Sequence, residues 1–186
     1  MLYLLLAEGF EETEAVAPLD VIRRAGLSIQ SVGVTGAAVT GAHGITIQTD
    51  VQIDDIFGGD MDGVILPGGM PGTLNLQKSL KVTAILNHCL QKEKLIAAIC
   101  AAPMVLGGLG MLSGRRATCF PGFEDQLDGA VLSDDSVVRD GNFITARGAG
   151  TALEFGAAIV DFFQPGDTGV SKGARVLAQM QTPAHV

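Results

Sequence analysis

Short apolar runs alternate with helix-like stretches along most of this chain, and this alternation restricts its fold more than any other feature. Runs such as LYLLL near the start and LIAAI in the middle are uncharged and rich in branched residues, which is typical of strands buried on both faces. We expect strands at 2–6, 28–34, 62–69 and 95–99, and helices at about 12–25, 79–92, 151–163 and 169–180. The alternation predicts an α/β fold, a three-layer sandwich with a mainly parallel sheet in the middle.

The remaining segments are shorter and carry turn signals. Residues 39–50 (VTGAHGITIQTD) alternate in polarity and contain glycines, which favours a hairpin-like excursion. After Met111 come short strand-like pieces separated by Asp-Gly pairs. The sequence shows neither repeats nor a linker, so we expect one domain spanning residues 1–186.

Charge and composition exclude several classes of protein. A formal net charge of -8 argues against a stable nucleic-acid partner and against an anionic membrane surface. The first apolar run lacks a basic flank and is too short for a signal peptide, and no segment approaches the roughly 18 apolar residues of a membrane span. Three widely spaced cysteines fit reduced thiols better than a disulfide framework. We therefore expect a cytoplasmic protein without a membrane partner.

Three unusual segments stand where predicted strands end. They are AEGFEETE at 7–14, LPGGMPG at 66–72 and ICAAP at 99–103. The carboxyl ends of parallel strands meet at one edge of a sheet, where α/β proteins place their active sites. The sequence therefore predicts a functional site made from these segments.

Cys100 occupies the predicted corner between a strand and a helix that has Pro103 in its first turn. Ala98 and Ala102 flank it at minus two and plus two, where a sharp strand–nucleophile–helix turn needs small residues. Most free cysteines are buried small hydrophobes, and we interpret Cys89 and Cys119 in that way. The corner instead favours Cys100 as a nucleophile, with a pKa lowered by the helix N-terminus.

The glycines of LPGGMPG and the residue after Cys100 are candidate backbone donors. The amides of Gly69 and Ala101 could form an oxyanion site, although a plain tight turn explains LPGGMPG equally well. A phosphate P-loop is excluded because no Lys-Ser/Thr pair follows the glycines.

The acidic segment supplies a possible proton shuttle. One of its four glutamates could lie close enough to the thiol, and be buried enough, to have a raised pKa, but the pattern does not say which. The histidines are His43, His88 and His185, and none adjoins Cys100 in sequence. No spacing is typical of metal ligands, so we predict no metal.

The motifs AEGFEETEAV, RRAG, ILPGG, LIAAICAAP, CFP and RGAGTALEFGAAIV, taken in this order, resemble the ThiJ/PfpI superfamily, and specifically its parkinsonism-associated deglycase (ThiJ-type) branch. The resemblance runs from about Leu2 to Phe163 and continues weakly to Met180. It implies a flavodoxin-like sandwich of the class I glutamine amidotransferase-like type, and a homodimer with the first helix near the interface.

The resemblance also implies roles for individual residues. Cys100 would be a nucleophile that oxidises easily to a sulfinate, with Glu14 as a protonated carboxyl beside the sulfur and Gly69 and Ala101 as amide donors. Arg24 matches an anion-binding arginine of the first helix, and His43 stands where the family has a second arginine.

Two further positions depart from the pattern of other members. Ala101 follows the cysteine where protease-like and amidotransferase-like members have His, and Phe120 stands where others in the branch have a His before the proline of CFP. The departures leave Glu14 as the expected acid/base.

These observations favour a cofactor-independent enzyme that acts on α-oxoaldehydes such as methylglyoxal and glyoxal, or on early glycation adducts, through addition of Cys100. A redox sensor or redox-regulated chaperone that uses oxidation of the same thiol is the alternative. A flavin-binding protein is a weaker third hypothesis, because the acidic AEGFEETE replaces the hydroxyl-rich and glycine-rich phosphate loop that a flavin needs.

Overall fold

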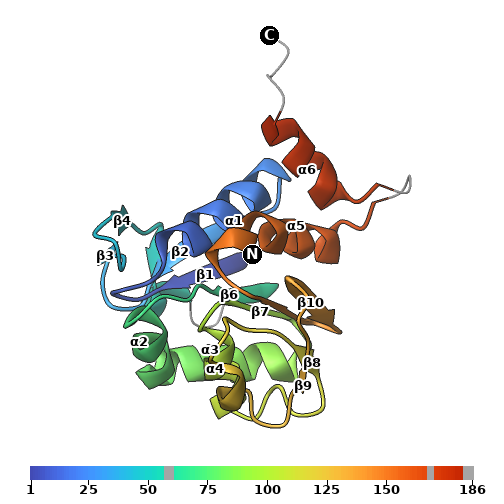
Figure 1. Ribbon diagram of the computed structural model, residues 1–186. Coiled ribbons are helices and arrows are strands. Elements are labelled where there is room, and N and C mark those ends of the chain that lie inside the picture. Colours follow the sequence, from blue (N-terminus) through green and yellow to red (C-terminus); the bar gives the residue numbers. More distant parts are fainter. Residues whose placement is uncertain (57–60, 167–169, 182–186) are drawn as a thin grey trace.

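A seven-stranded sheet forms the centre of the protein (Figure 1). The structure is a computed structural model that describes residues 1–56, 61–166 and 170–181. In spatial order the strands are β10 (Val137–Asp140), β11 (Phe143–Ala146), β7 (Leu95–Ile99), β6 (Gly63–Leu66), β1 (Leu2–Leu6), β2 (Ile29–Gly33) and β5 (Val51–Gln52). Neighbouring strands are parallel except for the antiparallel pair of β10 and β11. The predicted mainly parallel sheet is confirmed.

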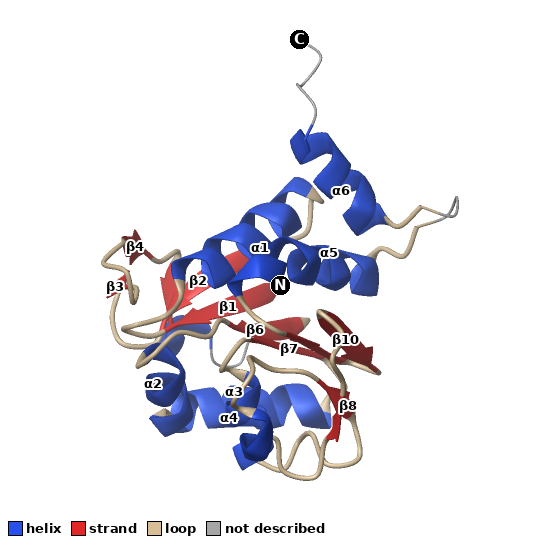
Figure 2. Ribbon diagram, viewed as in Figure 1, coloured by secondary structure: helices blue, strands red, loops and turns tan. Residues whose placement is uncertain are grey.

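Helices cover both faces of this sheet, as Figure 2 shows. The helices on one face are α1 (Glu12–Arg24), α5 (Ala152–Phe163) and α6 (Lys172–Gln181), and those on the other are α2 (Gly72–Lys78), α3 (Leu80–Gln91) and α4 (Pro103–Gly108). The smaller elements are the strand pairs β3 (Ala38–Thr40) with β4 (Thr46–Gln48) and β8 (Arg116–Ala117) with β9 (Val131–Leu132), and the 3₁₀ turns η1 (Ile53–Ile56), η2 (Glu124–Gln126) and η3 (Ala149–Thr151). The three-layer α/β sandwich is therefore confirmed.

Strand β1 shows why the strands have continuous apolar sequences. Leu4 faces the layer of α1 and α5, whereas Leu5 faces the layer of α3 and α4, and both are fully buried. Successive side chains of a strand point to opposite faces, so a strand covered on both sides needs apolar residues at every position. The run LYLLL meets that requirement.

Most predicted elements are present, with ends shifted by one to three residues. The predicted strand 95–99 coincides with β7, and the predicted helix 79–92 corresponds to α3. Helix α2 was not predicted, since no element was expected between the strand at 62–69 and the helix at 79–92. The last predicted helix was placed at 169–180, and α6 begins at Lys172, while residue 169 lies outside the described residues.

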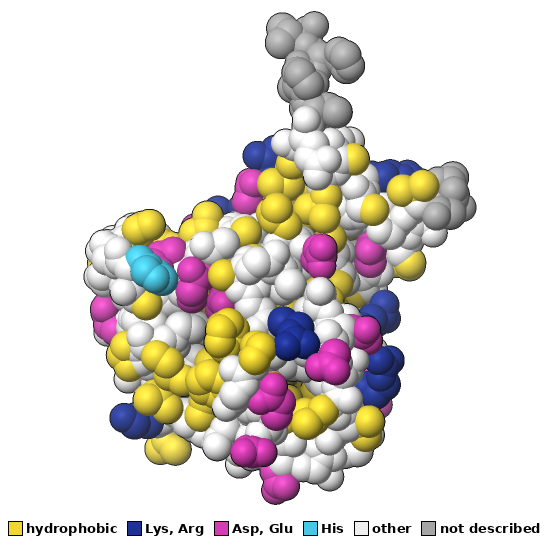
Figure 3. All heavy atoms as spheres, viewed as in Figure 1, with side chains coloured by type: hydrophobic (Ala, Val, Ile, Leu, Met, Phe, Trp, Pro, Cys, Tyr) yellow, Lys and Arg dark blue, Asp and Glu magenta, His cyan; other side chains and the backbone are white. Residues whose placement is uncertain are grey.

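Acidic side chains are scattered over the face shown in Figure 3, and do not form one patch. Within the described ranges, no helix is long and apolar enough to cross a bilayer.

The buried sheet predicts a sharp difference between two identical substitutions. Leu5→Ala should lower the free energy of unfolding by about 2–5 kcal/mol, because it leaves a cavity between β1 and the layer of α3 and α4. Leu80→Ala, at a side chain that is 85% exposed, should change it by less than about 0.5 kcal/mol. Urea denaturation of the two variants tests this difference, and equal losses would contradict the burial of β1.

Candidate active site

Cys100 lies at a strained corner between β7 and α4. Its φ is +65°, a left-handed conformation that residues other than glycine rarely adopt. The backbone on both sides of this strain is anchored: the Cys100 amide donates to the Ala146 carbonyl, and the Cys100 carbonyl accepts from the Phe120 amide, each at 2.9 Å. Ala98 and Ala102 are completely buried on either side. This geometry is that of a nucleophile elbow.

Glu14 is brought to the same corner by the first turn of α1. The Glu11 side chain caps this helix by accepting from the Glu14 amide at 2.7 Å. The Glu14 carboxyl is 1% exposed, accepts from the Gly68 amide at 2.9 Å and from the Ala149 amide, and shares a hydrogen bond with Cys100. Of the four glutamates in the acidic segment, Glu14 is therefore the one in contact with the thiol.

The two glycines after β6 permit this contact. A Cβ on Gly68 would lie 2.6 Å from Glu14 Oε2 and 2.8 Å from the Cys100 Cβ, so any side chain there would separate the pair. Gly69 has a φ of +90°, and a Cβ on it would lie 2.3 Å from the Glu11 backbone nitrogen. LPGGMPG therefore has glycines where two backbones approach closely.

Both predicted backbone donors lie against the sulfur. The amides of Gly69 and Ala101 donate hydrogen bonds to Cys100. Two converging N–H groups at one atom can stabilise negative charge on the sulfur or on an oxygen bonded beside it.

Burial is the main reason why the pKa of Glu14 is raised from 4.5 to about 7. The nearby Glu11 carboxylate acts in the same direction, while hydrogen bonds with Cys100, Gly68 and Ala149 oppose the shift. The direction agrees with the expectation of a protonated carboxyl at this position. Near neutral pH, Glu14 is able both to accept and to donate a proton.

The surroundings of Cys100 do not favour the low pKa that we expected for it. Burial, followed by the charge and hydrogen bond of Glu14, raises the pKa of this thiol to about 12, although the Ala101 and Gly69 amides lower it. The expectation took Glu14 as a protonated donor that would favour the thiolate, whereas burial of the sulfur and the Glu14 carboxyl beside it favour the neutral thiol. Cys100 and Glu14 titrate as a coupled pair, which holds two protons below about pH 7 and one proton above it.

The other two cysteines are more deeply buried than Cys100. Cys89 is fully buried and donates to the Met61 sulfur at 3.4 Å, and Cys119 is 4% exposed. Burial raises the pKa of each to about 11. Cys100 is partly exposed and is thus the thiol that a small molecule can reach most easily.

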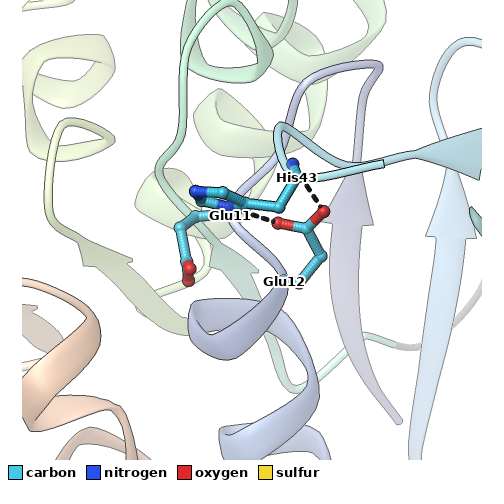
Figure 4. A group of neighbouring side chains, drawn as sticks. All are labelled: Glu11, Glu12 and His43. Carbon is cyan, nitrogen blue, oxygen red and sulfur yellow. Dashed lines mark hydrogen bonds and ion pairs between the residues drawn. The ribbon is translucent and has the colours of Figure 1, made fainter. Parts of the chain in front are cut away.

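His43 holds the β3–β4 hairpin against the start of α1 (Figure 4). Its Nδ1 lies 2.9 Å from Glu12 Oε2, and its backbone amide donates to Glu12 Oε1 at 2.8 Å. Contact with Glu12 raises the pKa of His43. Burial alone would raise the pKa of Glu12, but the hydrogen bonds that its carboxylate accepts, including those from His43, lower this pKa overall. The structure thus places His43 on Glu12, two residues before Glu14.

Glu11, Glu12 and His43 offer ligand atoms within 4.8 Å of one another, a spacing that a metal ion could bridge. In this arrangement, however, Glu12 already accepts from His43 and from the Ile45 amide, and Glu11 caps α1. The geometry is fully accounted for by contacts within the protein.

Arg24 is not brought to the Cys100 pair. It follows Glu14 by ten residues on α1, which corresponds to about 15 Å along the helix axis. Its side chain is 53% exposed and pairs with Asp20 at 2.8 Å. The anion-binding role suggested for Arg24 therefore has no support from the geometry of this site.

Sequence reasoning did not identify the segment after β11 as part of the site. A Cβ on Gly148 would lie 3.1 Å from the Phe120 ring and 4.0 Å from the Cys100 sulfur, and the Ala149 amide reaches Glu14. The small residues in RGAGT could have indicated this, since a strand end with small side chains lets another part of the backbone or a ligand approach closely.

A parallel sheet, a strained cysteine after one strand and a buried carboxyl against its sulfur define a class of α/β proteins with a nucleophile elbow. The chain belongs to the DJ-1/PfpI family, whose profile matches residues 1–162. This confirms the family resemblance inferred from the motifs.

Individual relatives agree with this assignment. The chain is 38% identical over 184 residues to a Parkinson disease protein 7 homolog of Danio rerio, covering 96% of this chain and 93% of the relative. It is 33% identical over 150 residues to a deglycase of Thermococcus kodakarensis, covering 79% and 89%. The crystal structure of Drosophila melanogaster DJ-1beta superposes with a TM-score of 0.89 at 35% identity, covering 98% of each chain.

The raised pKa of Glu14 predicts a pH-dependent stability. The folded state keeps a proton that the unfolded chain loses above about pH 4.5, so this stability is present at low pH and is lost as the pH rises through 7. In Glu14→Gln, which cannot ionise, the free energy of unfolding relative to wild type should rise by about 2–3 kcal/mol between pH 5 and pH 8.

Urea denaturation at several pH values measures this difference. Glu154→Gln is the matched control, because Glu154 is exposed at the start of α5. Parallel pH profiles for wild type and Glu14→Gln would contradict the raised pKa.

Proposed function

We propose that this protein is a cofactor-independent cysteine enzyme that converts small α-oxoaldehydes such as methylglyoxal or glyoxal to 2-hydroxy acids, or that acts on early glycation adducts by the same addition. The observation that carries the proposal is the contact between Cys100 and Glu14 beneath the amides of Gly69 and Ala101. A relative that is 33% identical is named a deglycase, which supports chemistry of this kind.

The first step follows from the shared proton. Glu14, ionised near pH 7, takes the proton of Cys100 as the sulfur attacks the aldehyde carbon. A carbon–sulfur bond forms, the carbonyl π electrons move to oxygen, and Glu14 returns its proton to that oxygen, which gives a hemithioacetal and leaves Glu14 ionised for the next step. The Gly69 and Ala101 amides stabilise charge at the sulfur and at the neighbouring oxygen.

The second step moves a proton between adjacent carbons. Glu14 removes the proton from the carbon bonded to sulfur, which gives an enediol, and a proton is returned to the neighbouring carbon. The product is a 2-hydroxyacyl thioester of Cys100. Water then cleaves the carbon–sulfur bond, so that methylglyoxal and one water give lactate and the free thiol.

A redox role is the second candidate, and the partial exposure of Cys100 supports it. Oxidation to a sulfinate would place oxygens near the Gly69 and Ala101 amides. A solved relative, Toxoplasma gondii DJ-1, is described as oxidized; it is 29% identical, with a TM-score of 0.90 and coverage of 98% of each chain. In this account the protein senses oxidants or acts as a redox-regulated chaperone.

The proposal includes a homodimer formed through α1. Val16 and Leu153 are 47% and 45% exposed and line an apolar groove of about 540 Å³ between α1, α5 and α6. A second copy would cover this groove. The proposal also places the protein in the cytosol, since Cys89, Cys100 and Cys119 are all free thiols.

Turnover of methylglyoxal tests the enzymatic proposal. Cys100→Ser should abolish lactate formation, and Glu14→Gln should lower kcat by about 10²–10⁴ because it retains a donor but cannot carry a proton. Cys89→Ser, at a buried thiol outside the site, should keep wild-type activity. Lactate formation by Cys100→Ser at the wild-type rate would refute the mechanism, while an inactive wild type that forms a stable sulfinate would favour the redox role.

Light scattering tests the dimer. At micromolar concentration the wild type should have twice the chain mass of 19.2 kDa. Val16→Glu should shift the protein toward the monomer, because it places a charge in the apolar groove, whereas Leu80→Glu, at an 85% exposed position on α3, should not. A wild-type protein of monomer mass would contradict this assembly.

A further inference from the structure

Arg147 lies between two cavities next to the catalytic pair. The first cavity, of about 360 Å³, is lined by Phe120, Pro121, Arg147 and residues 148–151. The second, of about 250 Å³, includes Cys119, Ser133 and Arg147 in its lining. Among the described residues that line either cavity, Arg147 is the only basic one.

The first cavity adjoins the reacting sulfur. Its Gly148 wall is so close to the site that an added Cβ would lie 4.0 Å from the Cys100 sulfur. The Ala149 amide, in the same wall, donates to Glu14. The Gly148 wall of the cavity that Arg147 also lines is therefore within reach of a small molecule bonded to Cys100.

The charge around the first cavity favours an anion. The Arg147 guanidinium is 32% exposed, and the residues that follow it form η3 and the N-terminal end of the twelve-residue helix α5, whose dipole is positive there. The second cavity carries Glu124 and Asp134, so an anion is expected in the first.

The existing partner of Arg147 does not neutralise it strongly. Arg147 Nη1 lies 3.3 Å from Asp134 Oδ1, but the Asp134 side chain is fully exposed, and ion pairs at such positions contribute little. The protein carries a formal net charge of -8 and has the Glu14 carboxyl at the site, so without a local cation a negatively charged molecule would be repelled.

We propose that Arg147, with the 148–151 wall and the Phe120 ring, forms a subsite for an anionic oxygen group, so that the preferred substrates are α-oxoaldehydes or adducts that also carry a carboxylate or phosphate. This inference rests on the proposed function of Cys100. The planar guanidinium matches the two oxygens of either group, and the apolar ring contacts the carbon chain between that group and the reacting carbon.

A purely structural role for Arg147 is the alternative. Its Nη1 also donates to the Asp134 carbonyl at 3.1 Å, which holds the loop before β10. A structural residue would affect every reagent at Cys100 alike, whereas a charge-binding residue would discriminate between anionic and neutral reagents.

Alkylation of Cys100 makes this distinction without requiring turnover. Iodoacetate and iodoacetamide form the same carbon–sulfur bond and release iodide, but only iodoacetate is an anion. The rate ratio of iodoacetate to iodoacetamide, followed at the Cys100 peptide by mass spectrometry, should fall about three- to tenfold in Arg147→Gln and stay within about twofold of wild type in Arg147→Lys. Arg139→Gln, which removes an equal charge outside both cavities, should leave the ratio unchanged.

If the iodoacetate-to-iodoacetamide rate ratio is unchanged in Arg147→Gln, including the case in which both reactions become slower by the same factor, the subsite is overturned. If Cys100 in the wild type reacts with neither reagent, the proposed function fails, and the subsite is then decided by titration with lactate and, separately, with inorganic phosphate. Shifts in the amide NMR signals of residues 148–151 that are lost in Arg147→Gln would support it, and their absence in the wild type would refute it. The two titrations also show which anion is preferred.

Discussion

The contact between the Glu14 carboxyl and the Cys100 sulfur is the interaction on which the rest of the site depends. The carboxyl reaches the sulfur because Glu11 caps α1 and because Gly68 has no side chain to separate the pair. The sulfur faces the carboxyl because Cys100 has a φ of +65°, which the carbonyl of Ala146 and the amide of Phe120 hold from both sides. Backbone strain and close approach are tolerated here because buried strands surround the corner.

Burial determines how this contact behaves chemically. It raises the pKa of Glu14 to about 7 and that of Cys100 to about 12, so near neutral pH the pair changes between two protons and one. A proton shared in this way can leave the sulfur as it attacks and return to carbon later, and this suits acid/base catalysis better than a permanently charged thiolate. The same accessible sulfur could instead be oxidised, which is why the enzymatic and redox hypotheses share their residues.

Prediction from sequence was most accurate where a pattern and a packing requirement coincide. The run LIAAI predicted β7 to the residue, because a strand covered on both faces needs apolar residues at every position. Helix α2 was missed, because it is short and begins directly after the Pro and Gly residues that ended the strand. The roles of Arg24 and His43 were inferred from the family resemblance. In the structure Arg24 pairs with Asp20 and His43 contacts Glu12, and neither is hydrogen-bonded to Cys100 or Glu14.

The sequence by itself determined the layered α/β fold, the family and the corner at Cys100, because hydrophobic periodicity and small residues around a nucleophile are local properties of the chain. The residue pattern left open which of the four glutamates meets the sulfur, the family resemblance pointed to Glu14, and the tertiary structure places Glu14 there. Only the tertiary structure decided that burial raises the pKa of the thiol and that Arg147 lies beside the site. These outcomes depend on groups far apart in sequence, such as Glu14, Gly68 and Ala149, whose distances and shared desolvation arise only when the ends of the parallel strands come together.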